Sequence, residues 1–200
     1  MSNFSTTLIV ALIVYSLASF IIVYARGYGA KALKKCFPNL LPAQAYLLPS
    51  NNIIDSETQK RYYAFFARHI DGFKIFETDE QMKPMVCTAI TWLISQTRDA
   101  EKFPLILEEN MNLGFAYNLL GLKSHGIITT IIGLIINALL AIMDFRQILQ
   151  VHFQSLIMGS IIHILFLLFW ILIVTKSLVI TCGKNYARTL LSACDSPHFD

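Results

Sequence analysis

The sequence predicts a mainly α-helical membrane protein with three transmembrane helices, in which a mostly helical cytoplasmic domain lies between an N-terminal anchor and a C-terminal hairpin. Two observations lead to this fold class. The chain is 55% hydrophobic and only 14% charged, with a mean hydropathy of +0.55, as is typical of membrane proteins. Its apolar stretches from Ile127 to Met143 and from Ser155 to Thr175 approach the roughly 20 helical residues that a bilayer core requires.

The N-terminal segment predicts the first of the three spans. Residues 1–25 contain no charged side chain, and the stretch from Leu8 to Tyr24 is long enough to cross a bilayer. A cleaved signal peptide has basic residues near its start, whereas the first basic residue of this chain is Arg26. We therefore expect residues 1–25 to remain as a transmembrane anchor.

Residues 26–125 are expected to form a cytoplasmic sensing domain, because most of the 16 Lys and Arg and 13 Asp and Glu residues lie there. Three prolines predict an extended linker over residues 37–52. Ser56 and Gln59 fit a capping box for a helix that ends at Gly72. Short β-structure near Ile53 or over residues 73–76 stays an alternative.

Prolines delimit the next two helices of this domain. Pro84 restricts the second helix to Met85–Gln96, because a proline inside a helix removes one hydrogen bond. Pro104 fits the first turn of a third helix, Leu105–Leu120, and Gly121 is its expected C-cap. This third helix leads directly into the hairpin, predicted over residues 126–181, and residues 182–200 are expected to form a cytoplasmic tail.

Basic residues predict the orientation, since they favour the cytoplasmic side of a membrane. They follow the first span, precede the second and follow the third, while the N-terminus has none and the hairpin tip has only Arg146. We expect a multi-pass protein of the bacterial inner membrane, with a periplasmic N-terminus and a cytoplasmic domain and C-terminus.

The hairpin carries small and polar residues at helical spacing, which predicts an interior face. Such a face lines a pore if it is wet, or packs helices together if it is dry; both interpretations stay open. His163 either titrates in an ion path or hydrogen-bonds Asn137 or Thr130. The candidate residues are Thr130, Gly133, Asn137, Ala141 and Asp144, which follow Gly126 in the second span, and Ser155, Gly159 and His163 in the third.

The sequence lacks the motifs of an enzyme or of a metal site. No phosphate-binding glycine loop, HExxH motif or paired Cys ligands occur, so we expect no enzymatic activity, no metal and no cofactor. A membrane-bound hydrolase would have to use Glu108, Asp99 or His69. The four cysteines are expected to be free thiols in a reducing compartment.

Cations and aromatic residues alternate in the first domain helix. Lys60, Arg61 and Arg68 lie among Tyr62, Tyr63, Phe65 and Phe66, a combination that can hold phosphates and stack bases. The alternative is an amphipathic helix with its aromatic residues in the core and its cations in solvent.

The segment from Thr97 to Lys123 resembles small transmembrane effectors of bacterial anti-phage defence. The resemblance rests on Thr97-Arg98-Asp99, Lys102-Phe103-Pro104, Glu108-Glu109-Asn110 and the run from Gly114 to Lys123 ahead of a hairpin. It covers about half of the chain and is strongest for the Hailong-type membrane effector, followed by retron and oligonucleotide-signalling effectors. The family has two arginines where this chain has Ala116 and Tyr117.

The resemblance implies a homo-oligomer, expected to be a tetramer, that opens in the bilayer, depolarises the membrane and arrests growth of the infected cell. It also implies an oligonucleotide or nucleotide ligand made by a partner nucleotidyltransferase. Arg98 and Lys123 then join the three helix cations as candidate ligand-binding residues. The sequence leaves a second function open, a membrane scaffold or adaptor that recruits a cytosolic partner and uses the polar face only for packing.

Overall fold

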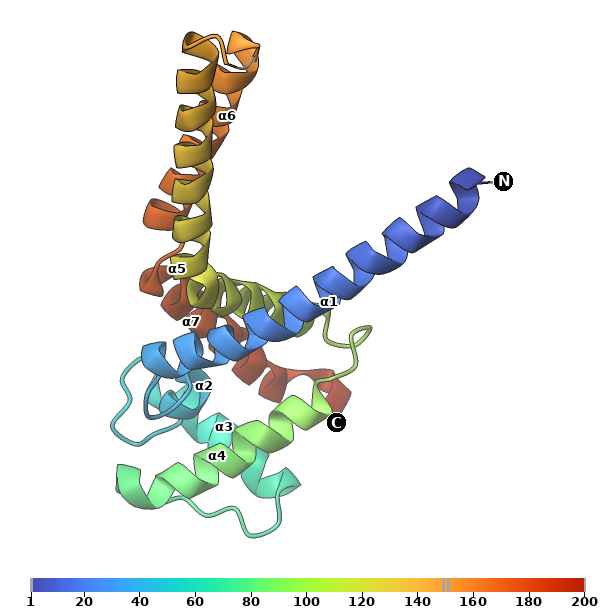
Figure 1. The fold of residues 1–200 in the computed structure, drawn as a ribbon. Coiled ribbons are helices and arrows are strands. Elements are labelled where there is room, and N and C mark those ends of the chain that lie inside the picture. The colour runs from blue at the N-terminus through green and yellow to red at the C-terminus, as the bar shows by residue number, and fades with distance from the viewer. Residues whose placement is uncertain (1, 149, 151, 200) are drawn as a thin grey trace. The chain divides into compact units, whose positions relative to one another are not determined.

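The computed structural model describes residues 2–148, 150 and 152–199, and every regular element in this part of the chain is a helix (Figure 1). The alternative of short β-structure near Ile53 or over residues 73–76 is therefore wrong. The elements are α1 (Ser2–Cys36), α2 (Pro42–Ala45), α3 (Ser56–His69), α4 (Asp79–Gln96), α5 (Pro104–Phe145), α6 (Phe153–Leu168), a π-helix η1 (Phe169–Ile173), α7 (Lys176–Ser192), and the short 3-10 turns η2 (Ala193–Asp195) and η3 (Pro197–Phe199).

The chain divides into two compact units, each built from segments distant in sequence. The first unit, which we call the hairpin unit, comprises Met1–Leu33 and Ala116–Leu178. The second, which we call the core unit, comprises Lys34–Phe115 and Val179–Asp200. Residues 182–200, predicted to be a separate tail, thus belong to the core unit.

Two helical segments are long and apolar enough to cross a membrane. They lie in Pro104–Phe145 and Phe153–Ile173, and only 11% and 6% of their most apolar windows are buried in the protein. A helix in the core of a soluble protein would be mostly buried. The predicted first span has a helical backbone in α1, but the side chains of residues 1–13 lie outside the described residues, so this span stays a prediction.

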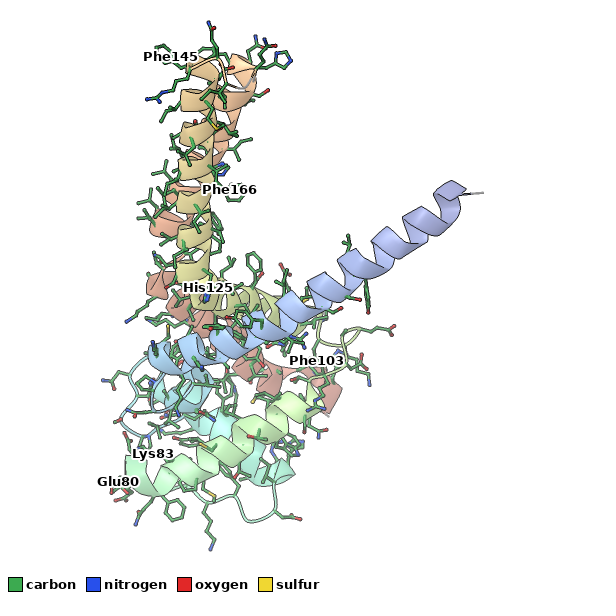
Figure 2. The ribbon with its side chains drawn as sticks, in the orientation of Figure 1. Glu80, Lys83, Phe103, His125, Phe145 and Phe166 are labelled. Carbon is green, nitrogen blue, oxygen red and sulfur yellow. The ribbon has the colours of Figure 1, made fainter. Side chains whose placement is uncertain are left out.

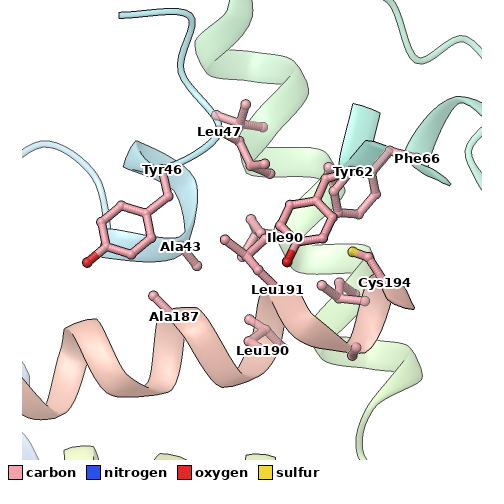
Figure 3. Close-up of a cluster of buried hydrophobic side chains, with 14 of the residues drawn as sticks. Ala43, Tyr46, Leu47, Tyr62, Phe66, Ile90, Ala187, Leu190, Leu191 and Cys194 are labelled. Atoms are coloured by element: carbon pink, nitrogen blue, oxygen red, sulfur yellow. The ribbon is translucent and has the colours of Figure 1, made fainter. Parts of the chain in front are cut away.

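The core unit is built around large apolar side chains from α3, α4 and α7 (Figure 3). Phe66, Ile90 and Leu190 are almost completely buried there. The segment predicted to be an extended linker contributes as well: it contains α2, and Leu47 is fully buried. Burial of its apolar residues offsets the conformational restriction that three prolines impose on this segment.

The N-terminal cap of α3 differs from the predicted capping box. Asp55 precedes the helix, and its carboxylate accepts a hydrogen bond from the Thr58 amide at 2.8 Å. Hydrogen bonds from Thr58 hold the pKa of Asp55 below its usual range. The Gln59 side chain instead donates to the Leu48 carbonyl at 2.9 Å. The helix ends at His69, before Gly72, whose φ of 79° follows in the turn.

Helix α4 begins earlier than predicted, at Asp79, and includes Pro84. Pro84 is close enough to the N-terminus that only one hydrogen bond is lost. Met82 and Val86, on either side of it, are fully buried. Their burial stabilises a turn that proline alone would disfavour.

Helix α5 continues through Gly121, which is not a C-cap. A Cβ at this position would lie 2.5 Å from the Tyr28 carbonyl carbon and 2.6 Å from the Gly29 nitrogen. Gly121 therefore allows the backbones of α1 and α5 to approach each other closely within the hairpin unit. Gly121, which we expected to end a helix, is the point at which α1 and α5 cross.

Candidate functional site in the hairpin

Helices α5 and α6 run side by side in the hairpin unit, and small residues form their contact (Figure 1). The Trp170 ring occupies the space that a side chain at Gly126 would need, and the His163 ring does the same at Gly133. Glycine at both positions lets a bulky ring from α6 or η1 lie directly on the backbone of α5. The space beside these two predicted face residues is thus filled by side chains of the same chain.

Asn137 supplies the direct polar link between the two helices. Its Nδ2 donates to the Leu156 carbonyl at 2.8 Å and to Ser160 Oγ at 2.7 Å. A Cβ on Gly159 would be 3.3 Å from the Asn137 amide, so the two residues are in close contact. Both N–H donors of this amide thus have partners within the protomer.

His163 is fixed by its own helix. Its Nδ1 lies 2.8 Å from the Gly159 carbonyl oxygen, which can only accept a hydrogen bond. Nδ1 therefore donates this hydrogen bond, and Nε2 lies against Gly133 of α5. The hydrogen bond to Asn137 or Thr130 that the sequence suggested as an alternative is not the one that forms.

A hollow of about 260 Å³ opens on the side of the hairpin beside His163. Thr129 and Thr130 line it from α5, while Ile162, His163 and Phe166 line it from α6. Phe166 is labelled in Figure 2. Thr130 Oγ1 donates to the Gly126 carbonyl at 2.7 Å, and Thr129 Oγ1 donates to the His125 carbonyl at 2.9 Å. The hydroxyl protons are thus committed to the helix, and oxygen lone pairs remain for the hollow.

The other predicted face residues differ in exposure. Ala141 and Ser155 are exposed, and Asp144 is half-buried. Sequence reasoning missed Ser160 and Thr129. Leu156, Ser160 and His163 follow one another at helical spacing. The same pattern, started at Leu156 instead of Ser155, would have included Ser160 in the third-span face.

Two of the candidate ligand-binding cations have acidic partners in the core unit. Lys60 pairs with Glu57 at 2.7 Å, and Arg61 binds both carboxylate oxygens of Asp195 at 2.7 and 3.0 Å. The Asp195 carboxylate raises the pKa of Arg61. Arg68 and Arg98 are exposed.

The aromatic residues between these cations belong to the core. Tyr62, Tyr63, Phe65 and Phe66 are between 0% and 7% exposed. Burial raises the pKa of Tyr63 to about 12, and its hydroxyl donates to the Leu47 carbonyl at 2.6 Å. They offer no exposed faces on which bases could stack, in agreement with the amphipathic-helix alternative.

Lys123 has a structural partner in the hairpin unit. Its Nζ donates to the Val174 carbonyl at 2.8 Å and to the Ile171 carbonyl at 3.3 Å. These carbonyls lie at the end of η1, where a helix leaves acceptors without intrahelical donors. A cation there also interacts favourably with the helix dipole.

Two of the three residues that a hydrolase would need have hydrogen-bond partners near them in sequence. Asp99 accepts from the amides of Glu101 and Lys102, and His69 Nδ1 is 2.8 Å from the Phe65 carbonyl oxygen. Burial raises the pKa of the Cys194 thiol to about 12, so it is not a nucleophile at neutral pH. The described residues contain no group of three or more His, Cys, Asp and Glu side chains placed to hold a metal ion.

Comparisons with protein-family models, with curated proteins and with solved structures found no match to this chain.

Proposed function

We propose that this protein is an oligomeric, ion-channel-like effector of anti-phage defence in the bacterial inner membrane. Its hairpin crosses the bilayer together with the N-terminal anchor, and its core unit faces the cytoplasm. A nucleotide or DNA ligand, made by a partner nucleotidyltransferase, controls its opening through that unit. Opening depolarises the membrane and arrests growth.

One observation carries this proposal: a polar hollow lies on a helix that also belongs to the core unit. Thr129 and Thr130 are on α5, and the same helix begins at Pro104, next to Phe103 and Ile106 of the apolar core. A helix transmits displacement along its length because its backbone is hydrogen-bonded throughout. A conformational change that a ligand induces in the core unit can thus be transmitted along α5 to Thr129 and Thr130. The resemblance of residues 97–123 to defence effectors supports the same function.

The test is ion flux from liposomes that contain the purified full-length protein. We expect the protein to release a trapped ion, and the release to change when oligonucleotides are added. Gly133→Leu displaces the His163 ring and should abolish flux and toxicity without loss of membrane insertion. Ile132→Leu, at the exposed neighbouring position, is the matched control. Absence of flux from inserted, folded protein under all ligand conditions would overturn the channel.

The second candidate function is a membrane scaffold that recruits a cytosolic partner. The intrachain contacts of Gly126, Gly133 and Asn137 favour it, because these residues are fully used in packing. Under this function, Asn137→Leu lowers activity only as far as it lowers stability. Partner capture by the membrane-bound protein would also survive in variants that conduct no ions.

A further inference from the structure

The hollow beside His163 has a chemical character that suggests which ions it accepts. The two threonine hydroxyls among its lining residues present acceptors. They donate to carbonyls of their own helix at 2.7 and 2.9 Å, and the His163 ring donates from Nδ1 to the Gly159 carbonyl at 2.8 Å while its Nε2 lies against Gly133. What remains for an occupant is the lone pairs of the two hydroxyls.

Among the described residues, no lysine or arginine lines this hollow. Its remaining walls are the apolar side chains of Ile162 and Phe166. The nearest lysine in the second span, Lys123, directs its ammonium to the carbonyls of Ile171 and Val174. An anion in the hollow would therefore meet acceptors and apolar walls, with no donor to replace its hydration shell.

We propose that this hollow is a cation subsite of the conduction path, and that the open protein passes monovalent cations in preference to anions. Hydroxyl lone pairs of Thr129 and Thr130 replace part of the hydration shell of a cation, as oxygen ligands do in selective pores. The inference rests on the proposed channel function and specifies the ion class that it conducts. It assigns Thr129 and Thr130 as the residues that determine selectivity.

The experiment measures the reversal potential of the full-length protein in a planar bilayer under a KCl gradient. We expect it to lie near the K⁺ equilibrium potential. Thr129→Val with Thr130→Val removes both hydroxyls and keeps the side-chain shape. Loss of one contact between a hydroxyl and the cation lowers the preference for K⁺ by about fivefold. The K⁺ to Cl⁻ permeability ratio should therefore fall by about fivefold or more.

Two controls separate selectivity from folding. The variant with Thr129→Ser and Thr130→Ser keeps both hydroxyls and should keep the ratio. Ser124→Ala removes an exposed hydroxyl from the same helix outside the hollow, and should also leave the ratio unchanged. Circular dichroism and gel filtration establish that the valine variant is folded.

The outcomes distinguish this inference from the channel itself. An anion-selective or unselective current, or an unchanged ratio in a folded valine variant, overturns the cation subsite and leaves the channel standing. If the valine variant does not fold, Thr130→Val alone replaces it, and an unchanged ratio has the same meaning. Absence of any current from folded wild-type protein overturns the channel and the subsite with it.

Discussion

The core unit and the α5–α6 hairpin place their large and small residues in opposite ways. In the core unit, aromatic and branched side chains such as Phe66 and Leu190 are buried, and the charged residues Lys60 and Arg61 are exposed. In the hairpin, large side chains such as Ile132 and Leu165 are about half or more exposed, while glycines and an asparagine form the contact. The difference shows that water drives the packing of one unit, whereas close approach and hydrogen bonding hold the other.

The two tryptophans allow this contrast to be tested unit by unit. Trp92 packs against the apolar core and Trp170 lies on Gly126 in the hairpin. The chain contains only these two tryptophans. Trp170→Phe therefore leaves a reporter of the core unit, and Trp92→Phe leaves a reporter of the hairpin.

Truncation of a buried ring should have the largest effect. Phe66→Ala removes a fully buried side chain, and we expect the free energy of unfolding of the core unit to fall by about 3–5 kcal/mol. Ile132→Ala, whose side chain is 50% exposed, should change stability by about 0.5 kcal/mol or less. Denaturant titration in detergent measures both, followed by Trp92 fluorescence for Phe66→Ala and by Trp170 fluorescence for Ile132→Ala. Equal losses in the two variants would contradict the contrast.

Removal of the interhelical amide should have an intermediate effect. Asn137→Leu loses the hydrogen bonds to Leu156 and Ser160, which we expect to cost the hairpin about 0.5–2 kcal/mol. Ala138→Leu, at the exposed neighbouring position, is the control. Titration with sodium dodecyl sulfate, followed by Trp170 fluorescence, reports hairpin separation. A more stable hairpin in Asn137→Leu would mean that apolar packing dominates there as well.

Loss of one surface hydrogen bond should have the smallest effect, and it should depend on pH. Ser50 donates its amide and hydroxyl to Asp79 at 3.1 and 2.5 Å, which lowers the pKa of this carboxyl. A lowered folded-state pKa contributes stability above the unfolded pKa, and that stability is lost as the pH falls through the folded pKa. Ser50→Ala should thus destabilise the core unit slightly at pH 7, with the difference closing toward pH 3. Denaturant titration followed by Trp92 fluorescence measures the unfolding midpoints of the wild type and of Ser50→Ala at each pH. A difference between the two midpoints that grows on acidification would contradict this role of Asp79.

Local patterns in the sequence predicted the helices and the faces of the hairpin. Gly133 and Asn137 on α5 lie four residues apart, as do Gly159 and His163 on α6, so the common direction of each pair follows from neighbours in the chain. The partners of Gly121 and Arg61 lie far away in sequence, on α1 and at Asp195. No local pattern indicates such contacts, which is why Gly121 was predicted to end a helix and the ion pair between Arg61 and Asp195 was not predicted.

The helix crossing at Gly121 constrains how this chain can evolve. At Gly29, the obstructing atoms include the Asn118 side chain, so a smaller residue at position 118 could make room for a substitution. At Gly121, the nearest atoms are backbone atoms of Tyr28 and Gly29, which every amino acid possesses. No second substitution can relieve a side chain at position 121 without moving a helix. Related chains that keep this crossing should therefore retain glycine at position 121, while position 29 can covary with position 118.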